Sequence, residues 1–210
     1  MTKTGKGDGG RAAGKTASGH LSRREAVKTL LDDIGDTLIV AGLAGAKGDV
    51  LAAVGPDYPL VFPFGGAMGA ATAMGLGLAL AQPDKRVLVV TGDGELLMNV
   101  GTLATVAVAN PPNLGIVCVD NEHYGETGFQ KSHTAFGTDL ATMASGAGIG
   151  AVRTVWEAAE LADAAALLRQ SNGASFVLLK VAVDDPPKVK TVWDAVYHKM
   201  RFRQALLGTP

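Results

Sequence analysis

The sequence predicts an α/β domain with a doubly wound, mainly parallel sheet and helices on both faces. Short apolar runs typical of buried strands alternate along the chain with stretches of helical period, an order that favours parallel strands joined by helices. The 210 residues are 47% hydrophobic but only 5% aromatic. We therefore expect one domain whose core is built from Ala, Val, Leu and Gly.

The first half of the domain is expected to begin with a capped helix. Ser22 opens the segment 22–34, and Glu25 follows three residues later, which is the pattern of a capping box. The elements predicted next are strand 37–42, helix 46–54, the extended segment 58–66 and helix 69–82. Helix 69–82 consists of small and apolar residues on all sides, so we expect it to be buried, with a neighbouring backbone packed close to its glycines.

The second half continues the alternation of strands and helices. The predicted elements are strand 87–91, helix 95–109, strand 114–119, loop 122–136, helix 139–148, strand 151–155, helix 156–170, strand 174–183 and helix 191–207. Long loops in compact domains are usually functional, which draws attention to 122–136. Residues 1–20 are rich in glycine and contain almost nothing that could be buried, so a disordered tail is expected before a domain that spans 21–210.

Composition excludes several classes of function. The formal net charge of −1 offers no general electrostatic argument for binding nucleic acid or an anionic membrane. Cys118 is the only cysteine and lies in an apolar strand, which indicates a small buried hydrophobe and excludes an iron–sulfur cluster or Cys₄ zinc site within the chain. With no apolar run of transmembrane length and no signal peptide, we expect a cytoplasmic protein.

Two strand ends near the middle of the chain present polar ligands. The first strand leads into Gly92-Asp93-Gly94, and 26 residues separate Gly94 from Asn121, which follows the next strand. Parallel strands end at the same edge of a sheet, so the Asp93 carboxylate and the Asn121 amide are expected side by side. Such oxygen ligands suit Mg²⁺, and the glycines let backbone N–H groups approach an anion. The unit predicts a site for a magnesium-bound diphosphate.

These residues resemble the diphosphate-binding motif of thiamine-diphosphate-dependent enzymes, in which GDG is followed after about 26 residues by Asn. GGAMGAATAMGLGLALAQPDKRV (65–87) resembles the segment that precedes GDG in the acetolactate synthase and decarboxylase group, and NEHYG (121–125) the segment that closes the metal site. The resemblance covers roughly residues 22–183. It is strongest to separately encoded subunits such as the beta subunit of sulfopyruvate decarboxylase, and to the C-terminal domain of phosphonopyruvate decarboxylase.

The resemblance implies thiamine diphosphate and Mg²⁺ as cofactors. Its metal ligands would be Asp93, Asn121 and the backbone carbonyl of His123. The residues expected to bind the cofactor are Gly42, Gly66, Met68, Gly92, Asp93, Gly94, Glu95, Asn121, Tyr124 and Gly125. Gly66 would offer its carbonyl to the aminopyrimidine, and Met68 would prop the cofactor into a V shape. Relatives often have Ser where this chain has Glu95, and a carboxylate there would repel the diphosphate unless it points away.

The loop after the metal site contains candidates for substrate contact. His123 and Glu126 are the catalytic candidates, although each taken alone is more typical of a solvated polar loop residue. In the family, the glutamate that activates the cofactor comes from a different, pyrimidine-binding domain. The length of 210 residues leaves room for the diphosphate-binding domain only. The resemblance therefore implies a beta-type subunit whose alpha partner supplies that glutamate, in a heterotetramer of two plus two.

The implied reaction is decarboxylation of a small 2-oxo acid. The surfaces expected to contact the partner subunit are helix 69–82 and loop 121–137. Three alternatives stay open: an acetolactate synthase-like carboligase subunit, a 2-oxo-acid oxidoreductase beta subunit, and a non-catalytic cofactor-binding or regulatory subunit. The absence of clustered cysteines speaks against the oxidoreductase.

Overall fold

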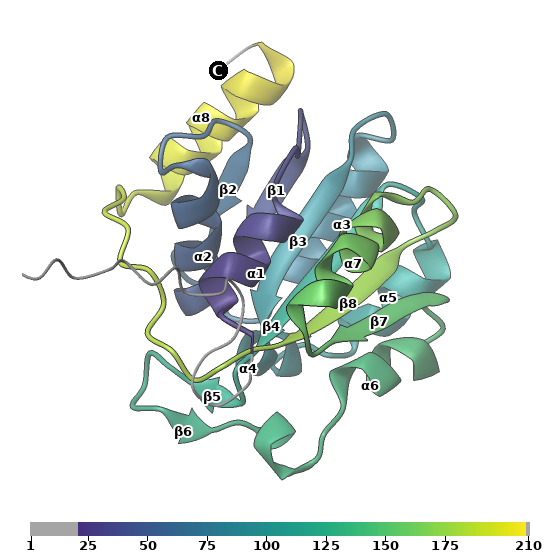
Figure 1. The fold of residues 1–210 in the computed structure, drawn as a ribbon. Coiled ribbons are helices and arrows are strands. Elements are labelled where there is room, and N and C mark those ends of the chain that lie inside the picture. Colours follow the sequence, from purple (N-terminus) through teal and green to yellow (C-terminus); the bar gives the residue numbers. More distant parts are fainter. Residues whose placement is uncertain (1–20, 209–210) are drawn as a thin grey trace, which may run out of the picture.

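A six-stranded, wholly parallel sheet forms the centre of the computed structural model, which describes residues 21–208 (Figure 1). Its strands are β1 (Leu38–Ala41), β2 (Val61–Pro63), β3 (Val87–Gly92), β4 (Leu114–Asp120), β7 (Ala151–Val155) and β8 (Ser175–Lys180). They are ordered β2-β1-β3-β4-β8-β7. The α/β class with a parallel sheet is confirmed, whereas the predicted disordered tail, 1–20, lies outside the described residues.

Helices cover both faces of the sheet and bury two separate cores. α1 (Arg23–Leu30), α2 (Ala44–Val54) and α7 (Leu161–Arg169) pack on one face, and α3 (Ala71–Ala81), α5 (Thr102–Ala109) and α6 (Leu140–Gly146) on the other (Figure 1). Alternate strand residues face opposite cores: Ile39 and Ala41 of β1 join the first, Leu38 and Val40 the second. α8 (Ala195–Leu207) packs beside the edge strand β2.

The predicted helix 95–109 is wrong as a single element. It is divided into α4 (Asp93–Leu97) and α5 by a turn that includes Gly101. Glycine has a low helix propensity, and the backbone of Gly69 packs against this turn, since a Cβ added there would lie 3.1 Å from the Cβ atoms of Met98 and Asn99. The α4 helix is consequently too short to have a strong dipole.

The predicted loop 122–136 is also more ordered than expected. It contains an antiparallel hairpin of β5 (His123–Tyr124) and β6 (Gln130–Lys131), followed by a 3₁₀ turn over His133–Phe136. Predicted helix 156–170 begins similarly with a 3₁₀ turn, Ala158–Glu160, before α7. In Figure 1 the hairpin lies beyond the carboxyl ends of the central strands, next to α4.

Helix α3 is buried on one face only, contrary to the expectation of burial on all sides. Gly75 packs against β3, where a Cβ would lie 2.1 Å from Val89 Cγ2, a close approach to a side chain rather than to backbone. Ala73, Gly77 and Leu80 are exposed, Leu80 to 57%. A helix that is apolar all round does not reveal from its sequence which face the sheet will cover. Within residues 21–208, a second apolar face of α3 is left without a packed neighbour.

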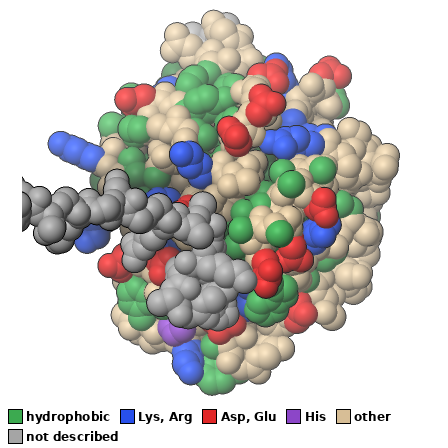
Figure 2. Space-filling model, viewed as in Figure 1, with side chains coloured by type: hydrophobic (Ala, Val, Ile, Leu, Met, Phe, Trp, Pro, Cys, Tyr) green, Lys and Arg blue, Asp and Glu red, His purple; other side chains and the backbone are tan. Residues whose placement is uncertain are grey.

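None of the helices within residues 21–208 is long and apolar enough to cross a membrane. Acidic and basic side chains are interspersed on the face shown in Figure 2. Cys118 is buried in β4, as expected for a small apolar residue, and burial raises the pKa of its thiol well above the usual value.

Candidate functional site

A pocket opens where β1, β3 and β4 end, the edge at which doubly wound sheets bind ligands. This site pocket is lined by Arg23, Leu43, Ala44, Gly45, Ala46, Met68, Gly92, Asp93, Gly94, Glu95, Val119, Asn121, His123, Tyr124, Gly125, Glu126, Thr127, Phe129 and Pro186. It includes both catalytic candidates and every residue expected to bind the cofactor except Gly42 and Gly66.

Asp93 and Asn121 follow neighbouring strands. Gly92 of β3 is paired with Val119 of β4, so the two polar residues come just after adjoining strand ends. Both are buried, with 2% and 6% of their surface exposed. The Asn121 side-chain oxygen accepts a hydrogen bond of 3.1 Å from the His123 N–H, which leaves one lone pair of this oxygen for another partner.

Two hydroxyl groups of the hairpin segment contact Asp93, and the sequence offered no motif by which to find them. The Ser132 hydroxyl donates to Asp93 Oδ2. The Thr134 hydroxyl oxygen lies 3.3 Å from the same atom and donates to Asp120 Oδ1, 2.8 Å away. Residues 132 and 134 are thereby held against the strand ends.

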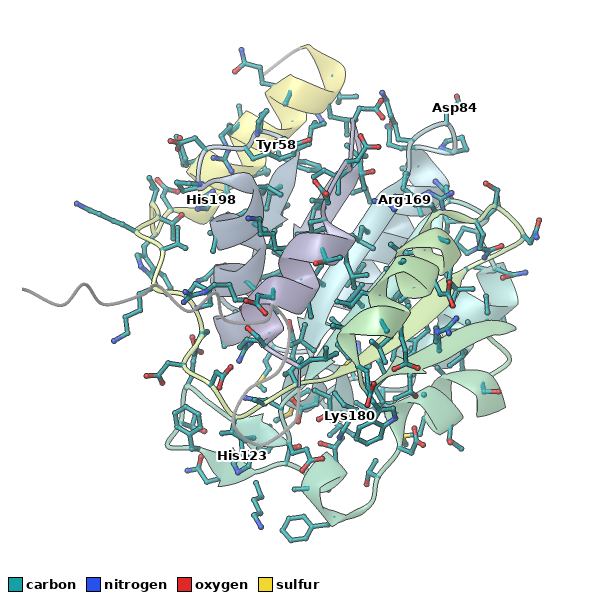
Figure 3. All side chains as sticks on the ribbon, in the orientation of Figure 1. Tyr58, Asp84, His123, Arg169, Lys180 and His198 are labelled. Atoms are coloured by element: carbon teal, nitrogen blue, oxygen red, sulfur yellow. The ribbon has the colours of Figure 1, made fainter. Side chains whose placement is uncertain are left out.

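Asp120 does not line the pocket and instead orients its loop. Its Oδ1 accepts from the Glu122 N–H at 3.0 Å, and its Oδ2 lies 2.8 Å from Lys180 Nζ. Lys180 also contacts Glu122 Oε1 at 2.7 Å. Figure 3 shows Lys180 at the same end of the sheet as His123. Lys180 thus neutralises the buried carboxylate of Asp120.

The electrostatics of Asp93 suit a hard cation. The pKa of this carboxyl is raised to about 6, chiefly by burial and in addition by the Asp120 carboxylate, against the hydrogen bond from Ser132 that lowers it. Residues 21–208 contain no cluster of three or more His, Cys, Asp or Glu side chains that could hold a metal. Mg²⁺ at Asp93 and Asn121 would therefore need carbonyl, phosphate and water oxygens as well, which is its usual coordination in proteins. The residues present fit the ion.

Glu95 is buried, with 4% of its surface exposed, and is directed toward the end of β1. Its Oε2 accepts from the Leu43 N–H at 3.0 Å and from the Thr91 hydroxyl at 2.8 Å, whereas Oε1 has no hydrogen-bond partner. Burial raises the pKa of this carboxyl, and hydrogen bonds from the Thr91 hydroxyl and from the backbone N–H groups of Leu43, Gly92 and Gly69 lower it. A Cβ at Gly42 would lie 1.9 Å from Oε2, so Gly42 makes room for Glu95 instead of lining the pocket.

Tyr124 covers the turn after β3. A Cβ on Gly94 would lie 2.4 Å from the Tyr124 ring, so the ring rests directly on this glycine. The backbone N–H of Ser132 donates to the Glu122 carbonyl at 2.8 Å and closes the hairpin beside it. Only a residue without a side chain fits at position 94 beneath the ring.

Met68 and Gly66 are separated by the structure. Met68 lines the site pocket and is 45% exposed. Gly66 instead lines a neighbouring cavity that it shares with Phe64, Trp193 and His198. Of the two residues expected to meet the rings of the cofactor, only Met68 therefore faces the pocket that contains Asp93.

Backbone strain is concentrated around the pocket. Ala44, Ala67, Glu122 and Phe129 adopt φ values of +55°, +59°, +64° and +58°. Side-chain-bearing residues rarely adopt this left-handed region, and such residues cluster at functional sites. Ala44 and Phe129 line the pocket, and the other two adjoin Met68 and Asn121.

The sequence is similar to those of a known family of proteins. Residues 49–179 match the model of the C-terminal TPP binding domain of thiamine pyrophosphate enzymes. The chain is 39% identical over 132 residues to the sulfopyruvate decarboxylase subunit beta of Methanocaldococcus jannaschii. This alignment covers 63% of this chain and 69% of that protein. It is 31% identical over 189 residues to the sulfopyruvate decarboxylase subunit beta of Methanococcus maripaludis. This alignment covers 89% of this chain and 98% of that protein.

A solved structure shares the fold. Benzoylformate decarboxylase from Polynucleobacter necessarius superposes with a TM-score of 0.65 at 18% identity, over 80% of this chain and 34% of that one. The chain thus spans about a third of that enzyme, and the likeness concerns the fold alone.

Proposed function

Because the chain belongs to the thiamine pyrophosphate enzymes and contains their C-terminal cofactor-binding domain, we propose that it is the beta-type subunit of a thiamine-diphosphate- and Mg²⁺-dependent 2-oxo acid decarboxylase. Sulfopyruvate and phosphonopyruvate are the substrates proposed. The Asp93/Asn121 pair in the site pocket is the observation that supports this best, because it lies in a chain aligned with almost the whole of a sulfopyruvate decarboxylase beta subunit.

The residues of this chain have distinct tasks in holding the cofactor. Asp93, Asn121 and the backbone carbonyl of His123 hold Mg²⁺, and the turn of Gly92 and Gly94 lies against the diphosphate. Met68 supports the rings. For Gly66, contact with the aminopyrimidine stays a prediction, since this residue lines the neighbouring cavity.

When bound, the thiazolium ring of thiamine diphosphate supplies an electron sink for loss of carbon dioxide from a 2-oxo acid. The hairpin residue Tyr124 packs over Gly94 and would cover this side of the bound cofactor. His123 Nδ1 lies 2.9 Å from the Asn121 carbonyl and donates to it. Because Nδ1 is engaged in this contact, Nε2 is the nitrogen of His123 that transfers a proton on the substrate side. The carboxylate of Glu126, which lines the same pocket, is the second group proposed for proton transfer.

An alpha subunit supplies the activating glutamate, and the assembly contains two copies of each chain. The exposed apolar face of α3 and the hairpin provide the contact surfaces, which agrees with the exposure of Leu80. Alone, the chain binds cofactor weakly and turns nothing over. A cytoplasmic location stays a prediction.

The test is to purify the chain with the small protein that associates with it and to supply Mg²⁺, thiamine diphosphate and sulfopyruvate, phosphonopyruvate or pyruvate. Release of carbon dioxide with the matching aldehyde is expected, and Asp93→Ala should abolish it. An acyloin product would indicate a carboligase, and turnover that requires an electron acceptor would indicate an oxidoreductase. Full activity of the isolated chain would contradict the split-subunit proposal, and no Mg²⁺-dependent cofactor binding in either setting would contradict the cofactor assignment.

A further inference from the structure

Lys180, the last residue of β8, joins the two carboxylates that flank Asn121. In the register of the sheet Lys180 is paired with Asp120, so the two side chains leave neighbouring strands on the same face. The Lys180 Nζ atom lies 2.8 Å from Asp120 Oδ2 and 2.7 Å from Glu122 Oε1. The Asp120 side chain is 1% exposed and that of Glu122 is 39% exposed. One ammonium group therefore holds both the residue before Asn121 and the residue after it.

The backbone between these two carboxylates is strained. Glu122 has a φ of +64°, in the left-handed region that a residue with a side chain rarely adopts. Its N–H donates to Asp120 Oδ1 at 3.0 Å, and the N–H of His123 donates to the Asn121 side-chain oxygen at 3.1 Å. Such a conformation persists only where the surrounding structure holds it. The directions of the Asn121 amide and the His123 carbonyl thus depend on how the two carboxylates are held.

Without the ammonium group of Lys180 the two carboxylates would repel each other. Asp120 Oδ2 and Glu122 Oε1 approach the same nitrogen, so two negative charges would face one another, one of them buried. Because Glu122 is the more exposed of the two, its side chain would turn toward solvent and change the conformation of the peptide groups beside it. Lys180 itself is not one of the residues that line the site pocket. Its effect on a ligand in the pocket must therefore pass through Asp120 and Glu122.

We propose that Lys180 is a positioning residue of the magnesium site and fixes the turn 120–123 in the conformation that binds the ion. The inference rests on the proposed function, because it takes Asn121 and the His123 carbonyl as ligands. Groups behind metal ligands orient them, and losing such a group typically lowers metal affinity by about 10- to 100-fold. The sign of the change is informative. Removing a positive charge near Mg²⁺ would by itself strengthen binding, whereas losing a positioning contact weakens it.

The test measures Mg²⁺ affinity by calorimetry on the chain with its partner subunit and thiamine diphosphate. Lys180→Met keeps an unbranched side chain without the charge and should lower the affinity at least about tenfold. Without any ligand, hydrogen exchange at the Glu122 and His123 amides should accelerate, because the turn is no longer held. The control Lys131→Met removes an exposed charge from the hairpin. It should leave the Mg²⁺ affinity unchanged or slightly higher.

Two further variants separate positioning from a merely structural role. Glu122→Ala leaves the buried pair of Lys180 and Asp120 intact, so it should fold even if Lys180→Met does not, and it should also lower the Mg²⁺ affinity. The double variant Asp120→Asn/Lys180→Met leaves no buried charge unpaired and should recover the melting temperature lost in Lys180→Met. It should not recover the Mg²⁺ affinity, because Glu122 still lacks the contact that holds it.

An unchanged or higher Mg²⁺ affinity in folded Lys180→Met, or in Glu122→Ala if the first variant unfolds, would overturn the proposal. Recovery of the affinity together with the melting temperature in the double variant would also overturn it and leave Lys180 a structural role only. Inorganic pyrophosphate with Mg²⁺ separates the two levels of inference. A wild-type assembly that binds neither pyrophosphate nor thiamine diphosphate refutes the proposed function. Wild-type binding that these substitutions do not weaken refutes only the role of Lys180.

Discussion

Asp93 illustrates how a single buried carboxyl ties stability to ligand binding. Its pKa of about 6 in the folded chain lies above the ordinary value of 3.8 for an aspartate, so the folded state binds a proton that the unfolded state releases. Between about pH 4 and pH 6, stability without ligands should therefore fall as the pH rises, by about 2–3 kcal/mol. Urea unfolding at pH 4.5 and pH 7 measures this change.

The matched variant for this prediction is Asp93→Asn. It removes the titrating group, so the variant should show a flatter pH profile and should be more stable than wild type at pH 7 without Mg²⁺. It should also lose Mg²⁺-dependent cofactor binding. An identical pH slope in the two proteins would show that other carboxyls dominate the dependence.

The Arg23–Asp49 ion pair is a second case in which burial decides how much stability a substitution removes. The side chains are 7% and 0% exposed and lie 2.8 Å apart. Asp49→Ala leaves a buried guanidinium unpaired and should destabilise the protein by about 3–5 kcal/mol. The exposed pair of Arg153 and Asp163, at 3.1 Å, provides the control, because Asp163→Ala should cost less than about 1 kcal/mol. Equal losses in denaturant titrations would contradict the prediction.

Among the secondary-structure elements, α6 depends on a side-chain cap. Asp139 accepts from the N–H groups of Ala141 and Thr142 at 2.9 Å and 3.0 Å, and these contacts lower the pKa of its carboxyl. Asp139→Ala should cost about 1 kcal/mol, whereas Asp139→Asn should cost little because Asn also caps. The effect of Asp139→Ala should be present at neutral pH and should diminish as the pH falls through the lowered pKa, which thermal melts at several pH values would test.

The hairpin depends on the hydroxyl contact between its following turn and β4. Thr134→Val keeps the shape but removes the 2.8 Å hydrogen bond to Asp120, at a cost of about 1–2 kcal/mol. Hydrogen exchange at the Ser132 amide should accelerate, and Mg²⁺ affinity should fall. Thr127→Val is the control, because it removes an exposed contact with Gln130 in the same hairpin. Unchanged exchange in Thr134→Val would argue that the hairpin is held by its backbone alone.

At the scale of the whole molecule, the exposed face of α3 indicates how a partner would be recognised. Leu80→Glu should leave the stability of the isolated chain within about 0.5 kcal/mol, because Leu80 is 57% exposed. It should abolish association with the partner subunit in size-exclusion chromatography, since a charge would be buried at the interface. Val108→Glu on α5, where Val108 is 89% exposed, should leave association intact. Retained association in Leu80→Glu would place the interface elsewhere.

Five of the six sheet strands, and the spacing of Asp93 and Asn121, were predicted from the sequence because they depend on local patterns, whereas β2 was expected only as part of an extended segment. Three features can be recognised without knowledge of distant contacts: an apolar run long enough for a strand, a Gly-Asp-Gly turn, and the number of residues to the next strand end. The parallel arrangement then brings the two strand ends to one edge of the sheet. Gly101 offered a local signal for the break between α4 and α5, whereas the packing of this turn against Gly69 depends on a distant contact.

Sequence alone thus determined the class of fold, the family and the places of Asp93 and Asn121 at neighbouring strand ends, through patterns that neighbouring residues encode. Tertiary structure decided the direction of Glu95, 52 residues from its partner Leu43, the approach of Ser132 to Asp93 across 39 residues, and the separation of Gly66 from the site pocket. These contacts join segments far apart in the chain. Their geometry is set by how the strand ends, the hairpin and the loop before α3 pack together, which no local pattern specifies.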